Sequence, residues 1–191
     1  MRSRIVLSWL MAAILGAAGC AELLPKSDVH TDVQWSTFND ARALIDAVQP
    51  YRTTKVDLAA AGVTELNPAV TLLSHAEIAL RFPIGGVLNE ADVDPGIRDC
   101  LKAGKGCSGY LLNIRRISND RVGDFWLDSF RFRRETQSSG WTFTALILFV
   151  DDRAVYAVYG GQPNVHETQV ERNPLGPLQG WGDWAAGAIL K

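Results

Sequence analysis

Residues 141–163, WTFTALILFVDDRAVYAVYGGQP, decide the fold that the sequence predicts. Residues 141–150 are apolar on both faces toward their end, which is typical of a strand in the middle of a sheet. Asp151 and Asp152 then supply turn chemistry, and the apolar run 155–159 predicts a return strand. We therefore expect a β-hairpin whose first strand is central.

Upstream of this hairpin, apolar residues recur with a twofold period and predict further strands. Residues 110–114 alternate Tyr, Leu and Ile with less apolar neighbours. In residues 126–133, aromatic side chains alternate with Ser129, Arg131 and Arg133, which we expect to face water. Residues 137–140, Gln-Ser-Ser-Gly, predict the turn before the hairpin.

Helical signals come earlier in the chain. Capping residues, apolar spacing and terminal Gly or Pro predict four short helices, which lie within residues 36–49, 54–62, 74–83 and 94–104. Helices followed by a run of strands predict an α+β fold, with N-terminal helices packed on one face of a three- to four-stranded antiparallel meander.

Residues 1–19 combine the features of a signal peptide. Arg2 and Arg4 give a positive start, residues 5–15 are almost wholly apolar, and residues 16–19 are small. The apolar run is too short for a membrane span, because a helix needs roughly 20 apolar residues to cross the bilayer. We expect this segment to direct export.

Cys20 follows directly, and LGAAGC (residues 15–20) is similar to the lipobox of bacterial lipoproteins, with Ala17 where that motif usually has leucine. The resemblance implies acylation of Cys20, and several acyl chains give firm membrane attachment. Ala21, where an aspartate would retain a lipoprotein at the inner membrane, implies the outer membrane. The alternative is an ordinary secretory signal with a chance cysteine.

These features predict four regions: a signal peptide (1–19), a lipidated tether (20–35), an α+β domain (36–163) and a Pro-, Gly- and Trp-rich tail (164–191), in which Trp181 is a candidate anchor. Because Arg2 and Arg4 are the only charged residues before Cys20, the rest of the chain has 17 basic and 21 acidic residues, a net charge of −4. This charge argues against nucleic acid as a partner.

Cys100 and Cys107 lie in a polar, glycine-containing segment and are predicted to form a disulfide after export. No sequence pattern predicts a catalytic residue, a cofactor or a metal site. The three histidines, His30, His75 and His166, lack metal-binding spacing. The acidic segment 90–94 is read as a solvated loop because it lacks the register of a calcium loop.

The helix in TTKVDLAAAG (residues 53–62) and the hairpin 141–163 resemble the BamE/SmpA-like outer-membrane lipoproteins. The resemblance implies two helices followed by a three-stranded meander and a role in envelope assembly. The chain is also similar to uncharacterised proteobacterial lipoproteins that share the ending RNPLGPLQG, residues 172–180. That second likeness implies no function.

Together, these observations predict a non-enzymatic outer-membrane lipoprotein that binds a protein partner in the periplasm. Candidate partner-binding residues are Arg131, Arg133 and Trp181, because exposed arginines can meet an acidic partner or lipid headgroups. Exposed aromatic residues lying together would mark a docking surface. The alternative is a periplasmic enzyme or small-ligand-binding lipoprotein with a pocket between helices and sheet.

Overall fold

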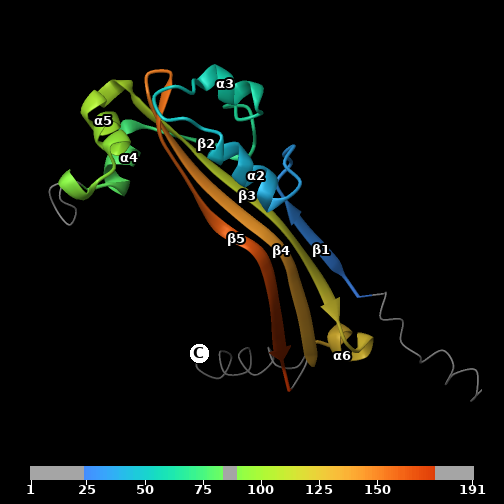
Figure 1. Ribbon diagram of the computed structural model, residues 1–191. Coiled ribbons are helices and arrows are strands. Elements are labelled where there is room, and N and C mark those ends of the chain that lie inside the picture. Colours follow the sequence, from blue (N-terminus) through green and yellow to red (C-terminus); the bar gives the residue numbers. More distant parts are fainter. Residues whose placement is uncertain (1–23, 84–89, 175–191) are drawn as a thin grey trace, which may run out of the picture. The chain divides into compact units, whose positions relative to one another are not determined.

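The computed structural model describes residues 24–83 and 90–174 (Figure 1). The described residues form the strands β1 (Lys26–His30), β2 (Val70–Leu73), β3 (Cys107–Val122), β4 (Arg133–Val150) and β5 (Arg153–Arg172). The α-helices in this part of the chain are α2 (Phe38–Asp46), α3 (Lys55–Ala60), α4 (His75–Arg81), α5 (Pro95–Ala103) and α6 (Phe125–Ser129). Single 3₁₀ turns cover Glu90–Asp92 and Gly104–Gly106.

The five strands make one antiparallel sheet with the order β1-β3-β4-β5. β2 pairs with β3, with Val70 opposite Leu112 and Leu73 opposite Gly109. β4 therefore lies between β3 and β5, which confirms the prediction of a central strand. β5 forms an edge of the sheet.

The chain divides into two compact units. Among the described residues, unit 1 contains residues 24–28, 118–139 and 166–174, and unit 2 contains residues 29–83, 90–117 and 140–165. The three long strands each contribute residues to both units, whereas α6 belongs to unit 1 and the other four helices belong to unit 2.

In unit 2, short helices cover both faces of the sheet (Figure 1). Phe143 and Ile147 of β4 share one buried cluster with residues of α2 and α3. Leu146 and Leu148, whose side chains alternate with these, share a second cluster with α4 and α5. Both faces of β4 are apolar, so each face requires a cover of its own.

The predicted packing of N-terminal helices on one face of a meander is therefore wrong. The sheet is the dominant element, the helices are short, and α4 and α5 cover the face that the prediction left open. The sheet is also longer than expected. Residues 26–30, placed in the tether, pair as β1, and β5 continues past residue 163 to Arg172.

Residues 137–140, predicted as a turn, lie inside β4. Gly140 has a φ of 146°, and a Cβ there would overlap the carbonyl oxygen of Arg116 on β3. Glycine is needed at this position because the neighbouring backbone approaches closely. The turn-like composition thus reflects contact between strands and not a reversal of the chain.

The predicted disulfide joins Cys100 of α5 to Cys107 at the start of β3. Both cysteines are buried in the second cluster of unit 2. The closed loop is short, so the bond should add stability near the lower end of the usual range of about 2–4 kcal/mol. It holds the end of α5 against the sheet.

Three helices of unit 2 begin with reciprocal capping boxes, formed by Thr37 and Asp40, Thr54 and Asp57, and Ser74 and Glu77. The backbone N–H groups of Thr37, Thr54 and Ser74 donate to these carboxylates at 2.9, 2.8 and 2.8 Å. The cap hydrogen bonds lower the pKa of each carboxyl group, mainly through the Thr37 side chain for Asp40 and through the cap backbone for Asp57 and Glu77.

A lowered pKa in the folded chain predicts how the three caps respond to pH. Their contribution is complete above the unfolded-state pKa, near 4, and is lost as the pH falls through the folded-state values. We expect carboxyl NMR titrations of Asp40, Asp57 and Glu77 to have midpoints below those of unfolded peptides. The protection of amides in the first turns, measured against the intrinsic exchange rate at each pH, should fall below about pH 4. Midpoints at the peptide values would contradict this prediction.

Candidate functional site

α6 in unit 1 carries the most unusual surface among the described residues. Asp124 caps this helix, and its carboxylate accepts hydrogen bonds from the N–H groups of Trp126 (2.9 Å) and Leu127 (3.0 Å). The strand predicted over residues 126–133 is therefore wrong up to Phe132, and only Arg133 lies in a strand, as the first residue of β4. Trp126 and Phe130 fit a helical spacing of four as well as a twofold period, and the cap at Asp124 decides for the helix.

The C-terminal end of α6 is a Schellman motif. The Arg131 N–H donates to the Asp128 carbonyl, and the Phe132 N–H donates to the Leu127 carbonyl, both at 2.9 Å. Arg131 has a φ of 58°, the left-handed conformation that this motif requires. Glycine usually occupies the position, so Arg131 is retained at a cost in backbone strain.

Four apolar side chains of this segment are exposed to solvent, and we call them the α6 patch: Trp126, Leu127, Phe130 and Phe132, with exposed fractions of 53, 43, 50 and 42%. The rings of Trp126 and Phe130 are stacked with their centroids 6.0 Å apart, and Phe125 meets Trp126 edge to face at 5.4 Å. Single exposed apolar residues are normal, but four within seven residues, two of them with stacked rings, make this segment a candidate interaction surface.

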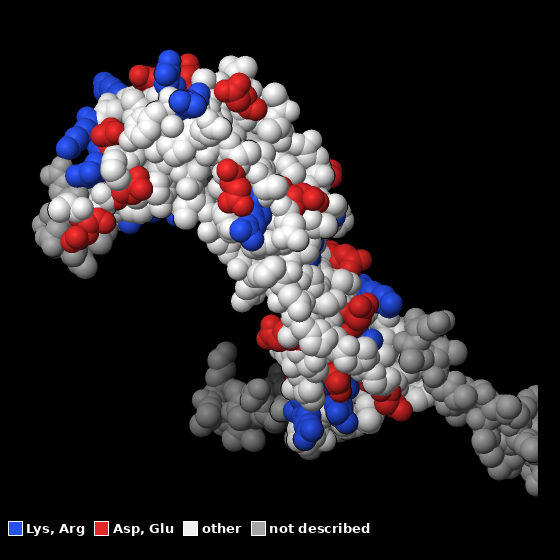
Figure 2. All heavy atoms as spheres, viewed as in Figure 1, with Lys and Arg blue, Asp and Glu red and all other residues white. Residues whose placement is uncertain are grey.

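Arg131 and Arg133 lie on either side of Phe132, and both are exposed. The structure places Arg131 in the turn after α6 and Arg133 at the first position of β4, where its guanidinium pairs with Glu135 at 3.2 Å. Two of the three predicted partner-binding residues thus lie beside the α6 patch. At the end of unit 1 where α6 lies, Figure 2 shows basic and acidic side chains next to one another.

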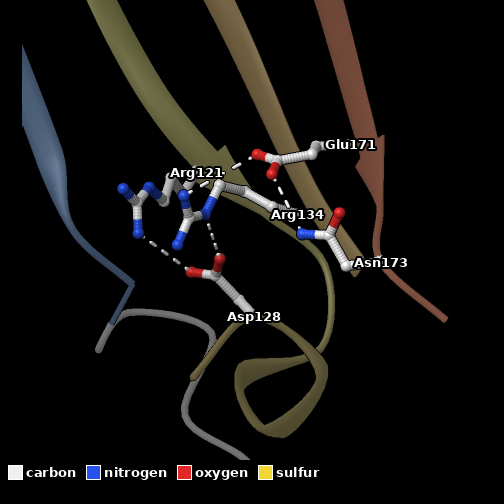
Figure 3. A network of polar contacts seen from close by, with 5 residues as sticks. All are labelled: Arg121, Asp128, Arg134, Glu171 and Asn173. Atoms are coloured by element: carbon white, nitrogen blue, oxygen red, sulfur yellow. Dashed lines mark hydrogen bonds and ion pairs between the residues drawn. The ribbon is translucent and has the colours of Figure 1, made fainter. Parts of the chain in front are cut away.

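A buried carboxylate fixes α6 to the sheet (Figure 3). Asp128, only 5% exposed, pairs with Arg121 of β3 at 3.4 Å and with Arg134 of β4 at 3.0 Å. Arg134 also reaches Glu171 of β5 at 3.8 Å, and the Asn173 side chain donates to Glu171 at 3.0 Å. The network connects α6 to three strands and holds the patch on the outside.

Sequence analysis missed Asp128. The sequence offers one indication of its role: Asp128 stands between aromatic residues, four positions after the cap residue Asp124. The arginines that it pairs with, Arg121 and Arg134, lie on the two flanking strands. The twofold alternation of aromatic residues predicts a strand here and obscures the helical spacing. No isolated property of Asp128 distinguishes it from the surface aspartates.

Replacement of Arg131 by glycine should stabilise unit 1, because glycine adopts the left-handed conformation without strain. We expect the free energy of unfolding to rise by about 0.5–1 kcal/mol. The control is Arg133→Gly, which removes the same charge from an extended position and should destabilise by a similar amount. Chemical denaturation measures both changes. Equal losses in the two variants would show that Arg131 is not strained.

Unit 2 contains an open hollow of about 570 Å³ between α5 and the β4–β5 turn. Polar residues at its rim include Tyr51, Asp99, Asp152 and Arg153. The Tyr51 hydroxyl donates to Asp99 at 2.8 Å, and this hydrogen bond raises the pKa of Tyr51. The hollow is the place where the alternative reading, a small-ligand site between helices and sheet, would apply.

Other candidate features carry less chemistry. Within residues 24–83 and 90–174, no group of three or more His, Cys, Asp or Glu side chains is placed to hold a metal ion. Asp94 of the acidic segment caps α5 by accepting from the Gly96 N–H at 2.8 Å. No helix in the described part of the chain is long and apolar enough to cross a membrane. Cys20 and Trp181 lie outside the described residues.

Comparison of the chain with known protein families, with curated proteins and with solved structures gave no match.

Proposed function

We propose that this protein is a non-enzymatic lipoprotein of the bacterial outer membrane, anchored through acyl chains on Cys20, whose periplasmic domain binds a protein partner in envelope assembly or integrity. The lipobox-like residues 15–20 support the anchor. The likeness to BamE/SmpA proteins supports a place in the envelope through the hairpin, although the helices are arranged differently.

The observation that carries the partner-binding role is the outer edge of β5. Residues 51–55 cover only its beginning, where the Ala154 N–H donates to Thr53 and the Ala154 carbonyl accepts from Tyr51. No described strand pairs with this edge beyond that point. An open edge can accept a strand of another protein, with backbone pairing giving affinity and side chains giving specificity.

Val158 provides a test of this edge, because it is 43% exposed on β5 within unit 2. A deletion strain should become sensitive to detergents and large antibiotics, and the wild-type chain should restore resistance. We expect Val158→Asp to fail at normal protein levels, because a charge on the paired face disfavours strand addition. The control is Val56→Asp on α3, where the native side chain is 76% exposed.

Two results would contradict the proposal. Full complementation by Val158→Asp at normal protein levels would move the partner site away from β5. Turnover of a substrate by the purified protein, lost on Asp99→Asn, would favour the hollow beside Tyr51 and an enzymatic function.

A further inference from the structure

We infer that the α6 patch is inserted into the interface of the lipid bilayer that carries the Cys20 anchor. The inference rests on the proposed lipid anchor and deepens it, because it gives unit 1 a second contact with the same membrane. The lines of evidence are the length of chain between Cys20 and the sheet, the contacts that connect the start of β1 to α6, and the chemistry of the exposed side chains.

The chain between Cys20 and the described residues is short. Leu24 is the first described residue and is buried in unit 1. Four residues of extended chain span at most about 14 Å. An acylated Cys20 therefore keeps the start of β1, and with it unit 1, close to the headgroups.

The start of β1 is connected to α6 through a single residue. The Arg121 N–H donates to the Pro25 carbonyl at 3.4 Å, and the Arg121 guanidinium pairs with Asp128 at 3.4 Å. Lys26 also pairs with Asp120 at 3.5 Å. The point where the tether joins unit 1 thus lies beside the helix that carries the patch.

The patch has the composition of a membrane-interface segment. Trp is favoured at the headgroup level because its ring is apolar and its N–H is polar. Phe and Leu are typical of the apolar face of segments that lie in the interface. Arg131 and Arg133 flank Phe132 and can pair with lipid phosphates. Most exposed apolar residues of unit 2 are aliphatic, among them Val56, Leu66 and Leu80 on separate segments, and the exposed ring of Tyr51 is engaged by its hydrogen bond to Asp99.

Tryptophan fluorescence can test the insertion. The acylated protein is reconstituted into phosphatidylcholine vesicles with a minor fraction of phosphatidylserine, with or without bromine on the acyl chains. Bromine quenches only indole rings that reach the acyl region. The Trp126 signal, taken as the difference between wild type and Trp126→Phe, should fall by about half or more in brominated vesicles. The control is the Trp141 signal, taken as the difference between wild type and Trp141→Phe. Trp141 is a half-buried residue of unit 2, and its signal should not be quenched.

A second variant separates the role of the arginines. Arg131→Glu/Arg133→Glu should reduce Trp126 quenching in vesicles that contain phosphatidylserine and leave it nearly unchanged in pure phosphatidylcholine. Equal quenching of this variant and wild type in the anionic vesicles would overturn the role of the arginines.

The outcomes distinguish this inference from the anchor on which it rests. Intact mass reports the acyl chains on Cys20, and flotation reports attachment to vesicles. If the protein is acylated and floats but Trp126 is not quenched, the membrane assignment of the patch is overturned and the anchor stands; a protein partner or the chain's own tail on the patch would give this result. A chain without acyl groups that fails to float would overturn the anchor and the tether argument together.

Discussion

Replacement of Asp128 by alanine is expected to lower the free energy of unfolding of unit 1 by about 2–3 kcal/mol. The carboxylate is 6% exposed as a side chain and is the shared partner of Arg121 and Arg134. Its removal leaves two guanidinium groups facing each other without the charge between them. The cost is below the usual range for fully buried pairs because the arginine side chains are 32 and 26% exposed.

Hydrogen exchange and denaturant unfolding measure this effect. Peptides that cover residues 121–135 should exchange faster in Asp128→Ala than in wild type. The control is Asp46→Ala, which breaks a pair of similar length, 3.1 Å to Arg42, between side chains that are about half exposed. That loss should stay below about 0.5 kcal/mol. Equal effects at the two positions would show that the Asp128 network does not hold α6.

The second large effect is expected from Gly161→Ala in β5. Gly161 has a φ of 129°, and an added Cβ would overlap the carbonyl oxygen of Thr142 on β4. A side chain is disfavoured at this φ and the obstacle is backbone, which cannot move aside as a flexible side chain would. We expect a loss of about 2–4 kcal/mol.

The neighbouring glycine is a matched control for this change. A Cβ added to Gly160 meets no atom within 4 Å, and Gly160 is not among the residues with positive φ. Gly160→Ala should therefore be neutral or stabilise the strand by up to about 1 kcal/mol. Chemical denaturation of the two variants under the same conditions measures the difference between their free energies of unfolding. Similar stabilities would contradict the close approach of β5 to β4 at Gly161.

The strongest local signals in the sequence predicted part of this fold correctly. The hairpin around Asp151 and Asp152 forms as expected, and its first strand is central because its apolar residues serve two faces. The helix after Ser74 begins with the predicted capping box, which is a local contact between residues close in sequence. The polar segment that holds Cys100 and Cys107, together with the expected export, predicted the disulfide.

The errors arose where distant contacts decide the structure. Residues 137–140 look like a turn, yet Gly140 is present because β3 passes close to it. Lys26 and its neighbours show no clear hydrophobic period, but they pair with β3 because the backbone groups on that side of β3 need hydrogen-bond partners. The position of α4 and α5 on the second face follows from the apolar residues of β4, far along the chain.

The candidate site was predicted only in part. The sequence indicates Arg131 and Arg133 as candidates, but its twofold period predicts a strand where α6 and its exposed aromatic residues lie; only Arg133 is in a strand. The position of Asp128 in a network from three strands depends on chain segments about 40 residues apart, such as Asp128 and Glu171. No periodicity within one segment reports such a contact.

The disulfide between α5 and β3 also reports the redox environment in which each copy of the chain folded. Cys100 and Cys107 can join only where thiols are oxidised, so a chain that folds in a reducing cytosol retains both thiols. A chain that folds in an oxidising compartment forms the bond and is lighter by two hydrogens within this one peptide segment. Because both sulfurs are buried after folding, reagents in the medium exchange them slowly. The redox state of Cys100 and Cys107 in each copy of the protein therefore reports whether that copy folded in an oxidising or a reducing compartment.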